Sequence, residues 1–140
     1  MFLSADDAKT IANKIIAGSQ ADACVVKIDG GEDNSLRFAR GGATTNLSHS
    51  EVVLRISAHI GGRIGSVTTT SLDDATLEAA RARAEEIARM LPVDPEYVAP
   101  LGQQDYDASN RYQPDAETLR LDALAALAAR CLLYTSPSPR

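Results

Sequence analysis

The sequence has few of the residues that mark a metal-binding, disulfide-rich or secreted protein. Among its 140 residues are two histidines, two cysteines and no tryptophan, and aromatic residues make up only 4%. Cys24 and Cys131 lie far apart and outside any CxxC spacing, so neither a disulfide framework nor a zinc ribbon is predicted. We therefore expect an aliphatic core and a reducing, cytoplasmic setting.

Long apolar runs and clusters of basic residues are also missing. No stretch approaches the ~20 apolar residues that a membrane helix needs, and the N-terminus turns acidic at Asp6 and Asp7, unlike a signal peptide. The formal net charge is −5 and Lys and Arg are scattered, whereas nucleic-acid binders usually present a basic face. We expect binding to neither membranes nor nucleic acid.

The residues that are present follow the patterns of a small α+β domain. Ser4 and Asp7 resemble a capping box, and apolar residues at helical spacing predict a helix over 5–17. Alternating or β-branched segments then predict four strands, at residues 23–29, 35–40, 51–60 and 63–70. Leu54 and Ile56 fall on the inward face of the third of these strands, and Gly61 and Gly62 supply a tight turn after it.

A second helix is predicted to begin after the N-cap Asp73 and to end at Pro92. Leu77, Ala80, Ala84 and Ala88 are among the residues of its apolar stripe, while Arg81 and Glu85 are assigned to the polar face. A segment with prolines and tyrosines over 93–113 is predicted to be a linker, and a third helix follows over 114–130. Strands grouped between helices imply a two-layer α+β domain, with both helices on one face of a four-stranded antiparallel sheet.

Each constellation that suggests chemistry has a structural explanation that is simpler. His49 and His59 lack the Cys or carboxylate spacing of a zinc site, and His59 is expected on the polar face of its strand. The glycines of 61–65 resemble a phosphate loop, but such a loop leads into a helix, and here they lie between two strands. Cys24, on an apolar strand face, is expected to be inert.

The remaining acidic candidates are explained in the same way. Asp73 and Asp74 could ligate a metal, but helix capping accounts for them. Asp105 and Asp107 are isolated in the predicted linker. We therefore assign no catalytic, cofactor-binding or metal-binding residue.

The order of segments nevertheless resembles a known family. ADACVVKIDGGEDNSLRFARGG and the later VVLRISAHIGGRIGSVTTTSLDDATLEAARARAEEIARML are similar to the N-terminal domain of TldD/PmbA proteins, zinc metallopeptidases also called modulators of DNA gyrase. The continuation PEYVAPLGQQDY resembles the linker of family members, and ETLRLDALAALAA resembles the helix that opens the next domain. The resemblance rests on a pattern and not on a catalytic signature.

The resemblance implies a function for the whole protein that these residues do not perform. Family peptidases carry an HExxxH motif in a later domain, where two histidines bind zinc and the glutamate acts as general base on a zinc-bound water. This chain has no such motif, and neither His49 nor His59 begins one. By resemblance, intact members hydrolyse peptides and form homo- or heterodimers, in which the N-terminal domain helps to enclose the substrate.

The last ten residues, CLLYTSPSPR at 131–140, differ from the rest of the chain. Codons that encode them resemble the end sequence of a transposase-based sequencing adapter, which suggests a non-native tail on a truncated gene. The expected organisation is a family-like domain at 1–92, a linker at 93–113, the first helix of a truncated domain at 114–130, and the tail.

Two other interpretations stay open. The chain can belong to a non-catalytic PmbA-like partner subunit, because the motif that distinguishes the subunits lies in a later domain. It can also be a complete small binding module that ends in a native tail.

Overall fold

The computed structural model describes residues 3–39, 42–102, 104–105, 107 and 121–135. Contacts divide the chain into two compact units. Unit 1 comprises Met1–Gly31 and Ser50–Gln104, and unit 2 comprises Glu32–His49 and Asp105–Arg140. Two long strands contribute to both units.

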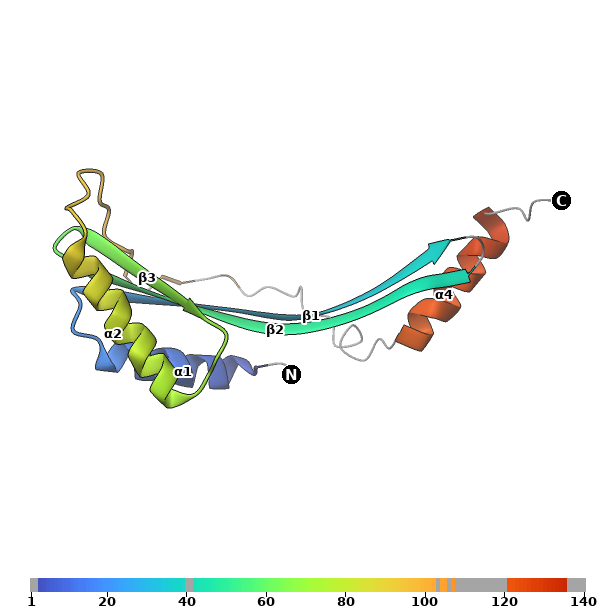
Figure 1. Ribbon diagram of the computed structural model, residues 1–140, viewed down its shortest axis with the longest axis horizontal. Coiled ribbons are helices and arrows are strands. Elements are labelled where there is room, and N and C mark those ends of the chain that lie inside the picture. Colours follow the sequence, from blue (N-terminus) through green and yellow to red (C-terminus); the bar gives the residue numbers. More distant parts are fainter. Residues whose placement is uncertain (1–2, 40–41, 103, 106, 108–120, 136–140) are drawn as a thin grey trace. The chain divides into compact units, whose positions relative to one another are not determined.

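The elements of the described chain follow in the order α1, β1, β2, β3, α2 and α4 (Figure 1). Their bounds are Ala5–Gly18 (α1), Ala23–Ala39 (β1), Gly42–Ile60 (β2), Arg63–Thr69 (β3), Asp74–Met90 (α2) and Leu121–Thr135 (α4). The strands form one antiparallel sheet in the order β1-β2-β3. The predicted α+β class is therefore confirmed, and none of the described helices is long and apolar enough to cross a membrane.

The prediction of four strands was wrong, because the first two are one strand. Gly30 and Gly31 were expected to end the first strand in a turn. Among the described glycines, however, only Gly61 and Gly62 have positive φ. Gly30 instead lies against β2, where an added Cβ would be 3.4 Å from Val52 Cγ2. Glycine in a strand often marks such a close approach of a neighbouring strand.

The second correction concerns β2, which begins at Gly42 and not near residue 51. The Thr44 hydroxyl donates to the Arg37 carbonyl of β1 over 3.2 Å, which joins the two strands within unit 2. The residues just before the predicted strand at 51–60 therefore belong to β2 and lie beside β1.

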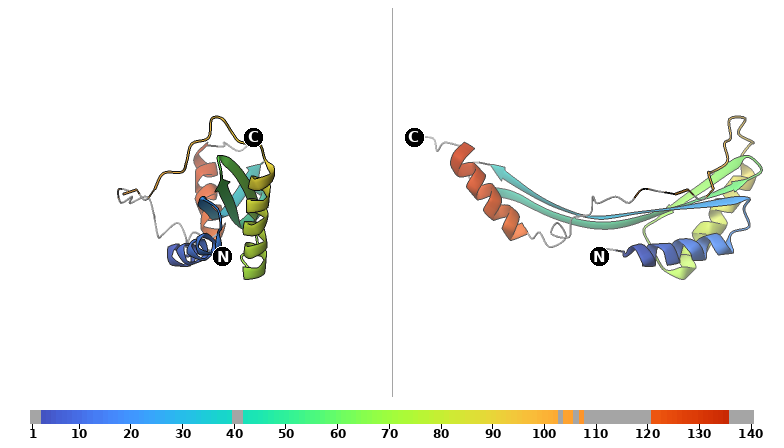
Figure 2. Two further views of the ribbon diagram at one scale, coloured as in Figure 1. Left: turned by 90° about the vertical axis from the view of Figure 1, so that its left-hand side faces the viewer. Right: turned by 180° about the vertical axis from the view of Figure 1, so that it is seen from behind.

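Unit 1 is a two-layer domain in which α1 and α2 cover the same face of the sheet (Figures 1 and 2). The core holds Leu54 and Ile56, each 0% exposed, so the predicted inward face of β2 is confirmed. Ile15 from α1 and Leu77, Ala80 and Ala84 from α2 complete the buried cluster. Burial of these aliphatic side chains is the main force that holds the helices to the sheet.

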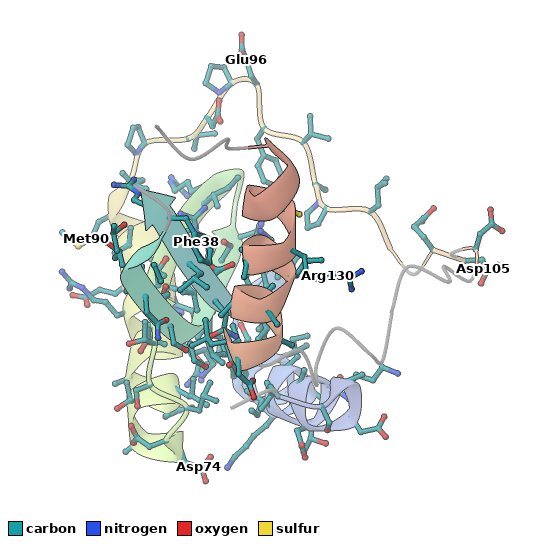
Figure 3. All side chains as sticks on the ribbon, turned by 90° about the vertical axis from the view of Figure 1, so that its right-hand side faces the viewer. Phe38, Asp74, Met90, Glu96, Asp105 and Arg130 are labelled. Carbon is teal, nitrogen blue, oxygen red and sulfur yellow. The ribbon has the colours of Figure 1, made fainter. Side chains whose placement is uncertain are left out.

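The helix boundaries follow from their caps. Ser4 Oγ accepts from the Asp7 N–H at the start of α1, and Asp73 accepts from the Thr76 N–H at the start of α2, as the sequence predicts. Asp74 and Met90 mark the two ends of α2 (Figure 3). The predicted third helix corresponds to α4, which continues to Thr135. Its predicted start at residue 114 lies outside the described residues.

Candidate functional site

The two histidines are not brought together by the fold. His49 belongs to unit 2 and is exposed, whereas His59 belongs to unit 1. Within the described parts of the chain, no three His, Cys, Asp or Glu residues gather in a group that could hold a metal ion. The metal that the family resemblance implies therefore does not fit these residues.

His59 lies on the expected face of β2 but is buried, with 7% of its surface exposed. Two neighbouring cross-strand pairs on this face are joined by side-chain hydrogen bonds, Ser57–Ser66 at 2.8 Å and Arg55–Thr68 at 3.5 Å. The chain after α2 covers His59, and its Nδ1 lies 3.3 Å from the Tyr97 hydroxyl. Sequence periodicity predicted the face but not this covering segment.

The covering segment is anchored to the hairpin turn between β2 and β3. The Asp94 N–H donates to the Gly62 carbonyl over 3.0 Å, and the Tyr97 N–H donates to the Asp94 carbonyl over 3.2 Å. An added Cβ at Gly62 would lie 3.3 Å from Val93 Cγ1. Residues 93–97 are thus held against the domain that precedes them.

The glycine turn itself is a hairpin and not a phosphate loop. Gly61 and Gly62 have φ of 55° and 73°, a conformation that glycine adopts without steric cost. The Asp22 carboxylate accepts from the Gly61 N–H over 2.8 Å. β3 follows directly, so no helix N-terminus is available here to bind an anion.

Two of the four acidic candidates, Asp73 and Asp74, have structural roles. Asp73 caps α2, and hydrogen bonds from the Ser71 hydroxyl and from Thr76 lower its pKa to about 2. Asp74 forms an ion pair of 2.6 Å with Lys14. Asp105 and Asp107 are exposed and lie outside helices and strands.

A buried ionic cluster was missed by the sequence prediction. Arg81 and Glu85 had been assigned to the polar face of α2, but both are buried, and Glu85 is only 3% exposed. Glu85 Oε1 accepts from Arg81 Nη1 over 2.6 Å, from the Gln20 N–H over 2.9 Å and from the Ser19 hydroxyl over 3.1 Å. Glu78 binds the same guanidinium. The cluster ties α2 to the chain that joins α1 to β1.

The electrostatics of this cluster favour ionised Glu85. Burial alone would raise its pKa, but the hydrogen bonds from Gln20, Ser19 and Arg81 outweigh burial and hold the pKa below its usual value. Burial also raises the pKa of the nearby Cys24 thiol. A raised pKa keeps a thiol protonated and a poor nucleophile.

A groove of about 340 Å³ lies in unit 1 at the C-terminal end of α2. Its walls come from the first two residues of β3, Arg63 and Ile64, and from the chain over 91–95. Ile64 is 40% exposed, Leu91 43% and Val93 55%, so the lining is accessible and largely apolar. Arg63 supplies a positive charge in these surroundings.

A second, apolar groove of about 390 Å³ lies in unit 2. Leu36 and Phe38 of β1 line one side, and Leu124, Leu127 and Cys131 of α4 line the other. The Cys131 side chain is exposed. Neither groove contains a histidine or a group of metal ligands among the described residues.

Comparison with known proteins shows a family that part of the chain matches. Residues 24–88 match the family described as PmbA/TldA metallopeptidase domain 1. The structure is similar to a Bacteroides thetaiotaomicron protein described as a modulator of DNA gyrase, with a TM-score of 0.80 and 18% identity, covering 99% of this chain and 33% of that one. No curated protein sequence matches.

Other solved structures show the same fold. A Thermotoga maritima protein, also described as a modulator of a DNA gyrase, has a TM-score of 0.68 and 18% identity, covering 87% of this chain and 28% of that one. TldE from Thermococcus kodakarensis has a TM-score of 0.61 and 14% identity, covering 80% and 24%. The chain thus spans a third or less of the length of these proteins.

Proposed function

Because residues 24–88 belong to domain 1 of the PmbA/TldA metallopeptidase family, we propose that the chain is the N-terminal part of a peptide-hydrolysing metalloenzyme. In this proposal the domain does not carry out the chemistry. It serves as a scaffold that contributes to dimer assembly and to the enclosure of the substrate. The match over residues 24–88 is the observation that carries the proposal, and the fold likeness supports it.

The distribution of chemical groups is consistent with a scaffold. The described residues offer no group of metal ligands, so we assign zinc to other parts of the intact protein. The buried charges of Arg81 and Glu85 are fully engaged with each other and with the α1–β1 connection. Such a satisfied network rigidifies a domain instead of reacting.

Unit 2 offers surface for assembly. Leu47 on β2 is 59% exposed, and the groove between β1 and α4 is lined by aliphatic and aromatic side chains. Exposed apolar surface of this kind is typical of protein interfaces. We infer that unit 2 contributes dimer contacts, and that the protein acts in the cytoplasm, as its composition predicts.

Peptide hydrolysis by the product of the complete genomic reading frame tests the catalytic part of the proposal. A fluorogenic unfolded peptide is incubated with that protein, with and without a chelator, and separately with the 140-residue chain. We expect chelator-sensitive cleavage by the complete product and none by the chain alone. Cleavage by the chain alone would contradict the scaffold role.

The same experiment addresses the non-catalytic alternative. A complete product that lacks HExxxH and does not cleave peptides, but binds a family member that does, would be a partner subunit. That result would reject catalysis by this polypeptide while leaving the scaffold role intact.

The assembly role is tested by the mass of the complete product in light scattering. We expect a dimer, and a Leu47→Asp variant should weaken it because a charge is placed in apolar contact surface. Asn46→Asp is the matched control, since neighbouring residues of a strand point to opposite faces. A dimer equally stable in both variants would show that Leu47 takes no part.

A further inference from the structure

We propose that the groove of unit 1 binds the C-terminal carboxylate of a peptide whose last side chain is apolar, with Arg63 as the carboxylate ligand. The proposed function does not assign this site. The choice of a peptide as ligand rests on the proposed function, whereas the chemistry of the site rests on the groove itself.

The first observation is an unsatisfied donor. Arg63 Nε is buried, and no described residue accepts a hydrogen bond from it. A buried donor without a partner destabilises a fold, so such groups usually have a water or ligand partner. Arg63 also forms no ion pair with the residues that the structure describes, and its charge is free to attract an anion.

The second observation is the chemistry of the ligand that this surface fits. Arg63 shares the groove with Ile64, Leu91 and Val93, so a charged group and an apolar body are required together. Guanidinium groups bind carboxylates through paired, charge-assisted hydrogen bonds. A peptide terminus that ends in Leu or Val presents both groups side by side, and a volume of about 340 Å³ lies within the range of ligand pockets.

Asp94 is the acidic residue that lines the groove beside Arg63. Its Oδ1 accepts from the Glu96 N–H over 2.9 Å, and it forms no ion pair with Arg63. The Glu96 side chain points outward from the crest of the loop after α2 (Figure 3). Arg89, at the end of α2, is directed to Glu85 at 3.4 Å. Arg63 and Asp94 are therefore the charged residues of the groove, and Arg63 is the one that attracts a carboxylate.

The position of Arg63 favours a peptide over other apolar carboxylates. It is the first residue of β3, which lies at the edge of the sheet. An edge strand offers backbone hydrogen-bonding groups that an extended peptide can pair with. A fatty acid has no such groups.

Two peptides that differ only at their C-terminus test the proposal on the 140-residue chain. One is N-terminally labelled Ala-Ser-Ala-Leu-Leu with a free carboxylate, and the other is the same peptide as its C-terminal amide. Fluorescence anisotropy should show saturable binding of the acid, and binding of the amide weaker by about tenfold or more, as expected when a charge-assisted hydrogen bond is lost. Equal affinities, or no binding of the acid, would overturn the proposal.

Variants assign the effect to the groove. Arg63→Met keeps the aliphatic stem and should abolish the difference between acid and amide, whereas Arg55→Met, on the exposed outer face of β2, should retain it. Val93→Asp, at an exposed position, should weaken binding of the acid peptide because it adds a negative charge that repels the carboxylate. If Arg63→Met does not fold, the acid and amide comparison on the unaltered chain and Val93→Asp still decide the outcome.

Additional controls separate this inference from the proposed enzyme. One control is an amidated peptide that carries an internal glutamate. If it binds as tightly as the acid peptide, the groove recognises carboxylates in general and not the C-terminus, and the proposal is overturned. Loss of binding in Arg63→Met with unchanged peptide cleavage by the complete product would support the groove as a separate site. Absence of cleavage in the complete product, with the acid and amide difference intact, would reject only the enzyme.

Discussion

Gly65 on β3 is the position where the packing of unit 1 is least tolerant of change. A Cβ added there would lie 2.1 Å from the Ala84 carbonyl oxygen and 2.4 Å from the Ala88 backbone nitrogen, whereas ordinary contacts begin at 3.4 Å. Because both neighbours are backbone atoms, no rotamer change relieves the clash. α2 must retreat from the sheet by roughly 1 Å, which weakens many dispersion contacts at once.

We therefore expect Gly65→Ala to destabilise the domain by about 3 kcal/mol, the upper end of the usual cost of overpacking. For a domain of this size, the melting temperature should fall by at least about 10 °C. Gly31→Ala is the matched control, since an added Cβ there has no atom within 4 Å. Thermal melts followed by circular dichroism that agree within about 2 °C for the two variants would refute the close packing of α2 on β3.

Three further changes test the core, the ionic cluster and the covering segment. Ile56→Ala, at a position that is 0% exposed, should lower the free energy of unfolding by about 2–5 kcal/mol in urea titrations, and a loss below about 1 kcal/mol would contradict the core assignment. Glu85→Gln should cost about 3 kcal/mol because it removes the buried counter-charge of Arg81 and leaves the guanidinium paired with the exposed Glu78 alone, whereas Glu86→Gln at an exposed site should cost little. Since Glu85 has a folded-state pKa below the usual 4.5, the stability that it adds is present above that pH and is lost as pH falls through the lower folded-state value. Glu85→Gln should therefore flatten the acid limb of the pH–stability curve, and an unchanged limb would show that Glu85 does not contribute. Tyr97→Phe should speed hydrogen exchange over residues 92–98 because the hydrogen bond to His59 is lost, and unchanged exchange would show that this bond does not hold the segment.

The helical part of the fold was predictable because its signals are local. Ser4 and Asp73 are N-caps in both the sequence prediction and the structure, and Pro92 lies just after the end of α2. The alternation of Leu54 and Ile56 predicted the buried face of β2 for the same reason. Each of these features depends on residues within one element.

The errors arose where the outcome depends on distant residues. Gly30 and Gly31 are as typical of a turn as Gly61 and Gly62, and only the proximity of Val52 on another strand shows why Gly30 stays extended. The described part of the chain therefore has three strands where local pattern predicts four.

The buried Arg81–Glu85 pair was missed because charge alone indicates solvent exposure. A signal was nevertheless present: opposite charges four residues apart lie beside the stripe formed by Ala80, Ala84 and Ala88. The partner that makes burial tolerable, the Gln20 backbone N–H, is far away in sequence. Similarly, no local pattern indicates that Tyr97 covers His59.

The genomic DNA sequence across the Arg130 codon tests the central claim most directly, because it shows whether this domain belongs to a longer metallopeptidase. We expect a reading frame that continues into a later domain with HExxxH. A long frame without this motif would contradict catalysis by this polypeptide and support a partner subunit. A genomic frame that encodes CLLYTSPSPR and then stops would contradict the account and favour a small binding module.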